Sequence, residues 1–179
     1  MISSKLDLKE YIKRDAVAYL EGNKDTFWLK YGDIRRFYRA LRHCEYHHNN
    51  HNIIRYFFCR LYYRRIGKRL GWDIPINVLG PGVRIMHPGT VVISGYSKIG
   101  EDSKIQVCVN IGASNGQKKA PIIGKHVYIG PGAKIFGDIY IADDIAIGAN
   151  AVVNKSFTTP GITVAGVPAK IISDKGHCF

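Results

Sequence analysis

The chain has 179 residues, a formal net charge of +12, four cysteines, 46% hydrophobic residues and 22% charged residues. This length accommodates one ordinary domain with a helical region before it, and the composition is that of a folded protein. No apolar run approaches the ~20 residues of a membrane-spanning helix, and the charged N-terminus MISSKLDLKEYIKRD lacks the apolar centre of a signal peptide. We therefore expect a cytoplasmic protein.

The cysteines are widely spaced and form no CxxC pair, which favours reduced thiols over a disulfide framework or a structural zinc site. They are Cys44, Cys59, Cys108 and Cys178.

The first 70 residues predict helices. In KLDLKEYIKRDAVAYL, Leu8 and Ile12 have helical spacing, and a second helix is expected from about Asp33 to Arg42. The second helix would place Ile34, Phe37, Tyr38 and Leu41 on one face. A third helix, in NIIRYFFCRLYYRRIGKRLG, would carry an apolar stripe of Ile53, Phe57, Leu61 and Ile66.

The basic residues concentrate in one segment. Residues 30–70 contain eleven basic residues and two acidic ones, a net charge of +9. Basic residues among aromatic ones suit an anionic membrane surface, an acidic or lipid-linked intermediate of a glycan pathway, or nucleic acid, of which nucleic acid is the least favoured. The alternative is a packed helix with a solvated basic rim. A peripheral position on the inner membrane face therefore stays open.

Four histidines lie close together: His43, His47 and His51 at i, i+4 and i+8, with His48 beside them. On one unbroken helix they could bind a transition metal. However, HHNNHN contains three asparagines, which are poor helix formers, and indicates a helix break. No acidic or cysteine ligand has suitable spacing, and we expect no metal site.

From residue 93 an aliphatic residue returns every six positions, with one twelve-residue step. The positions are Ile93, Ile99, Ile105, Ile111, Ile123, Ile129, Ile135, Ile141, Ile147 and Val153. A six-residue period needs a short strand and a tight corner, repeated, so that three strands close one triangular coil. Each coil then buries its inner side chains only against its neighbours. The pattern predicts a parallel β-helix of hexapeptide repeats.

Two interruptions of the period stand out. The polar segment GASNGQKKAPI between Ile111 and Ile123 predicts a loop that leaves one corner of the prism. Leu79, Ile85 and Val91 also keep a six-residue spacing, but two residues out of phase with Ile93, and the change falls just after His87. A coil that absorbs two extra residues must bulge there, and irregular backbone is frequent beside functional groups.

The hexapeptide run, the loop and the closing VAGVPAKII resemble the left-handed β-helix acyltransferases. Trp72-Asp73-Ile74-Pro75 followed by GPGVRIMHPGTVVIS resembles more narrowly the serine acetyltransferases and the related acetyltransferases of polysaccharide gene clusters. We accordingly predict a basic helical region over residues 1–70, a left-handed β-helix over 71–172 and a tail over 173–179. The resemblance implies a homotrimer, acetyl-CoA as donor and a site between neighbouring prisms.

The resemblance identifies His87 as the catalytic histidine and Asp73 as its partner. Transfer of an acetyl group from a thioester to a hydroxyl requires the hydroxyl to lose its proton, and a neutral imidazole can accept it. A carboxylate on the other ring nitrogen would fix the tautomer. Without the resemblance, a lone histidine among aliphatic residues is more often a satisfied core residue. Fourteen residues separate Asp73 from His87, so they could lie on adjacent coils, about 5 Å apart in the stacking direction.

For the donor, the resemblance places backbone groups of Ala113 and Ser114 against the pantetheine arm, where one amide would stabilise the oxyanion. It places the remaining contacts at Pro131, Gly132 and Ala149, which would line the CoA channel, and at Lys119 and Lys170, which would contact phosphate. The two lysines are also explained as ordinary solvated surface residues.

The acceptor site departs from the serine enzymes. They carry an aspartate where Met86 stands, and an Arg-His pair where this chain has Lys119-Ala120 before Pro121. Lysine cannot reproduce the planar fork of arginine. Met86 and Pro88, which flank His87, are the predicted acceptor contacts. These departures favour a sugar hydroxyl of a surface polysaccharide or its precursor as acceptor, with L-serine as the alternative. A binding or scaffolding protein that keeps the architecture without the reaction is the non-enzymatic alternative.

Overall fold

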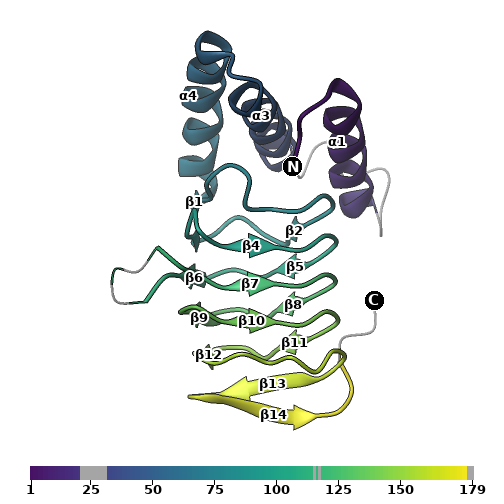
Figure 1. Ribbon diagram of the computed structural model, residues 1–179, viewed down its shortest axis with the longest axis vertical. Helices are drawn as coiled ribbons and strands as arrows, with labels where there is room; N and C mark the ends of the chain where they lie inside the picture. Colours follow the sequence, from purple (N-terminus) through teal and green to yellow (C-terminus); the bar gives the residue numbers. More distant parts are fainter. Residues whose placement is uncertain (21–31, 115, 117, 177–179) are drawn as a thin grey trace.

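A computed structural model describes residues 1–20, 32–114, 116 and 118–176. Helices lie at one end of an upright prism of short strands, and the C-terminal strands close the other end (Figure 1). The helices are α1 (Lys5–Leu20), α3 (Gly32–Asn49) and α4 (Ile53–Leu70). Cys178 lies outside the described residues, and Asn115 and Gln117 of the predicted loop do so as well.

The prism has three faces of parallel strands. Face A consists of β1 (Trp72–Asp73), β3 (Val91–Ile93), β6 (Val109–Gly112), β9 (Lys134–Phe136) and β12 (Val152–Val153). Face B consists of β4 (Lys98–Ile99), β7 (Ile122–Ile123) and β10 (Tyr140–Ile141). Face C consists of β2 (Arg84–Ile85), β5 (Lys104–Ile105), β8 (Tyr128–Ile129), β11 (Ala146–Ile147), β13 (Thr163–Gly166) and β14 (Ala169–Ser173). Only β13 and β14 pair antiparallel among the strands described.

The six-residue aliphatic positions form the core of the prism. All ten side chains from Ile93 to Val153 are at most 3% exposed. They stack in register between coils, as in Ile105 with Ile129 and Ile111 with Ile135. Small residues two positions earlier, such as Ala133 and Ala151, are fully buried as well. The predicted β-helix of hexapeptide repeats is confirmed, and the polar segment after Ile111 leaves the prism as a loop between β6 and β7 (Figure 1).

The helical region differs from the prediction in two respects. Helix α3 continues beyond Arg42 to Asn49, so that His43, His47 and His48 are helical, and the predicted break falls between Asn49 and Ile53. In α4, Ile53 and Leu61 face solvent, whereas Ile66 lies on the buried face with Tyr63, Gly67 and Leu70. The expected stripe is therefore divided between opposite faces, because packing of α4 on α3 and β1 buries the face of Ile66 and leaves that of Ile53 and Leu61 in solvent.

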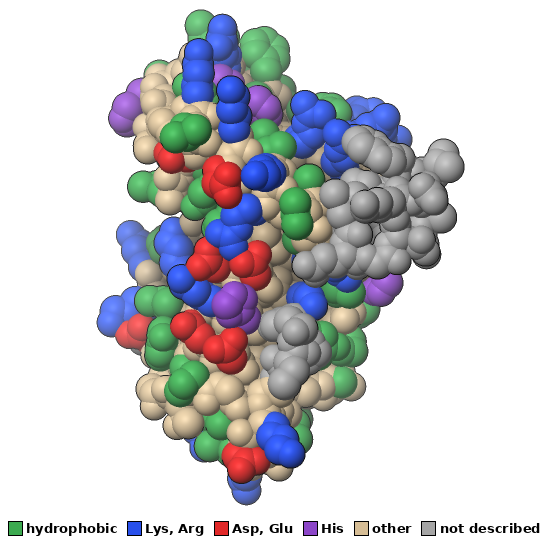
Figure 2. Space-filling view, turned by 90° about the vertical axis from the view of Figure 1, so that its right-hand side faces the viewer, with side chains coloured by type: hydrophobic (Ala, Val, Ile, Leu, Met, Phe, Trp, Pro, Cys, Tyr) green, Lys and Arg blue, Asp and Glu red, His purple; other side chains and the backbone are tan. Residues whose placement is uncertain are grey.

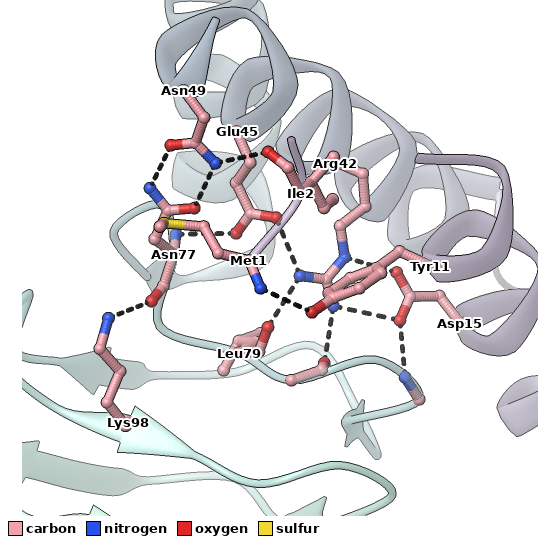
Figure 3. Close-up of polar contacts among 12 residues, drawn as sticks. Met1, Ile2, Tyr11, Asp15, Arg42, Glu45, Asn49, Asn77, Leu79 and Lys98 are labelled. Atoms are coloured by element: carbon pink, nitrogen blue, oxygen red, sulfur yellow. Dashed lines mark hydrogen bonds and ion pairs between the residues drawn. The ribbon is translucent and has the colours of Figure 1, made fainter. Parts of the chain in front are cut away.

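A buried ion network joins the helices to the first coil (Figure 3). The Arg42 guanidinium is fully buried and donates to both carboxylate oxygens of Asp15 at 2.7 and 3.1 Å, and to Glu45 at 3.0 Å. It also donates to the carbonyls of Leu79 and Gly80, both at 2.8 Å. Burial alone would lower the pKa of Arg42, but Asp15 and Glu45 more than offset it and raise the pKa. The network fixes α1 and α3 against the turn that precedes β2.

A second set of charges follows the edge between faces B and C. Figure 2 shows acidic, basic and histidine side chains in a column on this side of the prism. Arg14 of α1 pairs with Glu101 and Asp102, Lys125 pairs with Glu101 at 2.6 Å, and His126 contacts Asp144 at 3.2 Å. Hydrogen bonds from Lys125 and Arg14 lower the pKa of Glu101 to about 2. Opposite charges on successive coils thus support the stacking on an exposed edge.

Candidate active site

His87 lies at the edge between faces C and A, in the corner that joins β2 to β3. The register pairs Ile85 with Ile105 and Val92 with Asn110. Seven positions separate Ile85 from Val92 in the His87 coil, against five positions from Ile105 to Asn110 in the next coil. The two extra residues predicted from the phase change are therefore confirmed at this corner. The corner carries Met86, His87 and Pro88, and the last two are exposed.

The end of α4 holds this corner from above. The amide of Gly89 donates to the carbonyl of Leu70 at 2.8 Å, and the amide of Val91 donates to that of Gly71 at 3.0 Å. Gly71 adopts φ +79° as the C-cap of α4, and a Cβ there would lie 3.0 Å from the backbone of Gly89. A side chain at residue 71 would therefore be strained and would push the His87 corner away.

Two tyrosines, Tyr38 buried and Tyr19 half-buried, hold β2 just before the corner. The hydroxyl of Tyr19 accepts from the amide of Ile85 at 3.0 Å and donates to its carbonyl at 2.8 Å. The hydroxyl of Tyr38 accepts from the same amide at 3.2 Å. Burial raises the pKa of both phenols, so both stay protonated and able to donate. The helical region therefore fixes the backbone two residues from His87.

Asp73 lies on the coil next to that of His87, as predicted, but displaced along it. Asp73 pairs with Val92, five residues beyond the histidine, and both Asp73 and His87 are exposed. Within the described residues, no hydrogen bond or ion pair joins the Asp73 carboxylate to the His87 ring. Asp73 and His87 thus lie on adjacent coils, and a contact between their side chains stays a prediction.

Three of the predicted donor-side residues share the edge of His87. This edge, the His87 edge, consists of residues 86–90, 106–108, 130–133 and 148–151. Pro131 and Gly132 lie two coils from His87 and Ala149 lies three coils away, about 10 and 14 Å at the usual strand spacing. Pro131 and Ala149 are exposed.

The other predicted donor contacts lie elsewhere in the chain. Ala113, Ser114 and Lys119 belong to the loop between β6 and β7, which leaves the prism at the edge between faces A and B. Lys119 forms an ion pair with Asp138 at 2.6 Å, which raises the pKa of the lysine. Lys170 is exposed on β14. The described residues of the loop and His87 thus flank opposite sides of face A.

The histidines of α3 do not gather metal ligands. The rings of His43 and His47 stack at 6.4 Å, while His51 stands in the turn before α4 with φ +56°. In the part of the chain that the structure describes, no three His, Cys, Asp or Glu side chains are arranged to hold a metal ion. Among the same residues, no helix combines the length and apolar character needed to cross a membrane.

Four residues near the corner were not anticipated from the sequence. Tyr19 and Tyr38 belong to helices far from β2 in the chain, so no local pattern could connect them to it. Arg84 lies beside Met86, with its Nε 3.1 Å from the Met86 Sδ, and its Nη1 donates to the carbonyl of Ala18 at 2.7 Å. Cys108 is exposed on the His87 edge, one coil from the histidine. The six-residue period could have placed Cys108 on this edge, because the period also locates the corner of the next coil.

No protein-family model matches the chain. Among named relatives, a serine acetyltransferase of Mycobacterium tuberculosis is 44% identical over 105 residues, which cover 57% of this chain and 45% of the relative. A serine acetyltransferase of Buchnera aphidicola subsp. Schizaphis graminum is 36% identical over 139 residues, 75% of this chain and 53% of the relative. The chain spans about half the length of these relatives.

Solved structures agree on the fold. The serine acetyltransferase of Brucella abortus superposes with a TM-score of 0.80 at 26% identity, covering 96% of this chain and 71% of that one. The same enzyme in complex with coenzyme A has a TM-score of 0.76 at 26% identity, with 97% and 71% covered. A Neisseria gonorrhoeae serine acetyltransferase in complex with serine has a TM-score of 0.71 at 27% identity, with 93% and 69% covered. The predicted left-handed β-helix with a helical N-terminal region is confirmed.

These similarities correct the predicted acceptor. The preference for a polysaccharide hydroxyl, and for polysaccharide-cluster enzymes as the nearest pattern, is wrong, because the relatives and structures are serine acetyltransferases. The preference depended on Met86 and Lys119-Ala120, which lack the acid and the arginine of the serine enzymes. Loss of those groups at their usual positions does not exclude serine, since another side chain can supply the charge.

Proposed function

We propose that the chain catalyses transfer of an acetyl group from acetyl-CoA to the hydroxyl of L-serine, with His87 as general base. The observation that carries the proposal is the 44% identity over 105 residues to a serine acetyltransferase. The exposed His87 on an edge with small corner residues supports it.

Acetyl-CoA would supply the acetyl group as an activated thioester. His87 would accept the proton of the serine hydroxyl as the new ester C–O bond forms, and would return that proton to the sulfur as the C–S bond breaks. General-base assistance of this kind is worth about 10²–10⁴ in rate. Asp73, on the neighbouring coil, would orient the imidazole. The balance of the reaction is serine plus acetyl-CoA giving O-acetylserine plus CoA.

The donor would lie along the His87 edge in contact with Pro131, Gly132 and Ala149. The acceptor would contact Met86 and Pro88. Gly132 adopts φ +75°, and a Cβ there would lie 2.0 Å from the Asn150 Oδ1, so a larger residue would be strained and would need the Asn150 side chain to move. Ala113, Ser114 and Lys119 would complete the donor site from a neighbouring copy, because their loop lies on another edge, and Lys170 of β14 would add a phosphate contact. A homotrimer with its sites between prisms is therefore part of the proposal.

Arg84 would hold the serine carboxylate. Its guanidinium is fixed beside Met86 by Ala18 and lies over the Tyr19 ring at 5.8 Å, next to the corner of His87. A guanidinium can pair with a carboxylate through two parallel hydrogen bonds, whereas an ammonium cannot. Arg84 would thus take the part of the arginine that the loop lacks.

The test measures CoA release from acetyl-CoA with L-serine, and with L-alanine as the control acceptor without a hydroxyl. We expect turnover with serine only, and a loss of 10²–10⁴-fold in kcat for His87→Ala. Arg84→Lys should raise KM for serine by about tenfold or more and leave KM for acetyl-CoA unchanged. Absence of serine turnover by the folded wild-type protein would refute the proposal, and equal changes in both KM values would refute the role of Arg84.

A further inference from the structure

The outer surface of α4 is unusual in both its apolar and its charged residues. Six large apolar side chains in the first ten residues of the helix are between 52% and 78% exposed. They form what we call the α4 tip: Ile53, Ile54, Phe57, Phe58, Leu61 and Tyr62. The rings of Phe57 and Phe58 contact each other edge to face at 5.7 Å. Isolated exposed apolar residues are ordinary, but a contiguous group marks a contact surface.

Four of the six basic residues of α4 follow its tip along the helix axis, and the other two, Arg55 and Arg60, flank the tip. The buried face carries Tyr63, Ile66, Gly67 and Leu70. At 100° per residue, the opposite face is apolar in its N-terminal half and basic in its C-terminal half. The basic half, the α4 collar, consists of Arg64, Arg65, Lys68 and Arg69, all exposed. The tip occupies about 15 Å of helix, and the collar follows it towards the prism.

The tip also lies at an extremity of the molecule. Helix α4 rises from β1, and its N-terminal end is farthest from the C-terminal strands (Figure 1). Hydrophobic, basic and histidine side chains cover this end in the space-filling view (Figure 2). A flat surface could therefore reach the tip without meeting the prism.

We propose that the α4 tip docks on an anionic phospholipid surface. The apolar side chains would enter the boundary between headgroups and acyl chains, and the collar would contact the acidic headgroups. Charge complementarity favours this occupant. Helix α4 contains six basic residues and no acidic one, so two tips packed together would bring like charges near each other. On the neighbouring α3, Glu45 is buried against Arg42 and offers no compensation at the surface.

The experiment measures co-flotation of the full-length wild-type protein with vesicles of phosphatidylcholine and phosphatidylglycerol. We expect binding that weakens with salt and is absent with phosphatidylcholine alone. Phe57→Ser with Phe58→Ser should reduce partition by about a hundredfold, since each buried ring is worth about tenfold or more. Arg64→Gln with Arg65→Gln should reduce it by about 25-fold, about fivefold per charge.

Two matched controls lie at the opposite end of the prism. Ile171 and Ile172 are 57% and 64% exposed, so their replacement by serine removes similar apolar surface. Lys155 and Lys175 are exposed, and their replacement by glutamine removes the same charge as the collar variant. Both controls should leave partition unchanged.

The proposal would be overturned if the control variants lost as much vesicle binding as the tip variants. It would also be overturned if the wild type bound neutral and anionic vesicles equally. The proposal also fails if the wild type ignores vesicles while the double phenylalanine variant lowers its mass in light scattering. That result would assign the tip to a second copy of the chain. None of these outcomes depends on acetyltransferase activity, so failure of the docking proposal leaves the proposed function untouched.

Discussion

Replacement of Arg42 by methionine tests the buried network that joins the helices to the β-helix. Arg42 is 0% exposed and makes five hydrogen bonds, to Asp15, Glu45, Leu79 and Gly80. Methionine fills a similar length and keeps helix propensity nearly unchanged. The variant would leave two carboxylates buried without their cation, and two carbonyls without a donor. Among the described residues, Asp15 would keep the hydrogen bond from the amide of Gly82, and Glu45 would keep the one from the amide of Asn77.

Removing one member of a buried ion network costs about 3–5 kcal/mol, because the remaining charge stays desolvated. Total stabilities lie at about 5–15 kcal/mol, so the loss is a large share. For a chain of this size it corresponds to about 6–20 °C in Tm, at about 2–4 °C per kcal/mol.

The assay is urea and thermal unfolding followed by circular dichroism, at one protein concentration for all variants. The matched control is Arg36→Met, also in α3, because Arg36 is 67% exposed and pairs with Asp33 at 3.2 Å. Exposed pairs contribute about 0–1 kcal/mol, so this variant should remain near wild type.

A further variant separates charge burial from lost packing. A triple variant with Asp15→Asn and Glu45→Gln beside Arg42→Met should recover at least half of the loss, since no uncompensated charge remains. A loss for Arg42→Met no larger than for Arg36→Met, or a triple variant as unstable as the single one, would refute the reasoning.

Three other predictions concern the prism. Ile135→Ala should lower the free energy of unfolding in urea by about 2–5 kcal/mol, because Ile135 is fully buried. Ile122→Ala should lower it far less, because the Ile122 side chain is 51% exposed. Equal losses would contradict the assignment of Ile135 to the interior and Ile122 to the surface. The depressed pKa of Glu101, about 2 against 4.5, means that its stabilisation is present above pH 4.5 and is lost as pH falls towards 2. Glu101→Gln should remove that acid-dependent change, at most about 1 kcal/mol, and a difference from wild type that persists at pH 2 would contradict it. Alkylation of exposed Cys108 with N-ethylmaleimide should inactivate the protein, and bound acetyl-CoA should slow this alkylation. The Cys108→Ser variant should be active and should resist inactivation by N-ethylmaleimide. A fully labelled and fully active protein would show that the donor does not follow the His87 edge.

The β-helix could be predicted from the sequence because its information is local. Each coil buries its aliphatic residues only against the coils beside it, so the six-residue period is present in the chain itself. The phase change after His87 likewise predicted the enlarged corner, since two extra residues have no other place to go. The loop after Ile111 was evident for the same reason.

The acceptor was predicted wrongly because the charged groups of the serine enzymes are missing at Met86 and Lys119-Ala120. Their absence at these positions was interpreted as the absence of any such group from the acceptor site. Arg84, the cation that we propose for the acceptor carboxylate, lies two residues from Met86 along the chain, on a strand end held by Tyr19. Which cation can reach an acceptor depends on side-chain direction and on the neighbours that hold it.

The sequence by itself determined the solenoid, its core column and the corner of His87. Only the tertiary structure decided how the helices meet that solenoid. Arg42 contacts Leu79 across 37 residues, and Asp15 contacts Gly82 across 67, so no periodic pattern encodes either pairing. It also decided which side of α4 is buried, because apolar residues lie on both sides and packing against α3 and β1 selects one of them. Short-range repetition is read directly from a sequence, whereas contacts between distant segments depend on the whole fold.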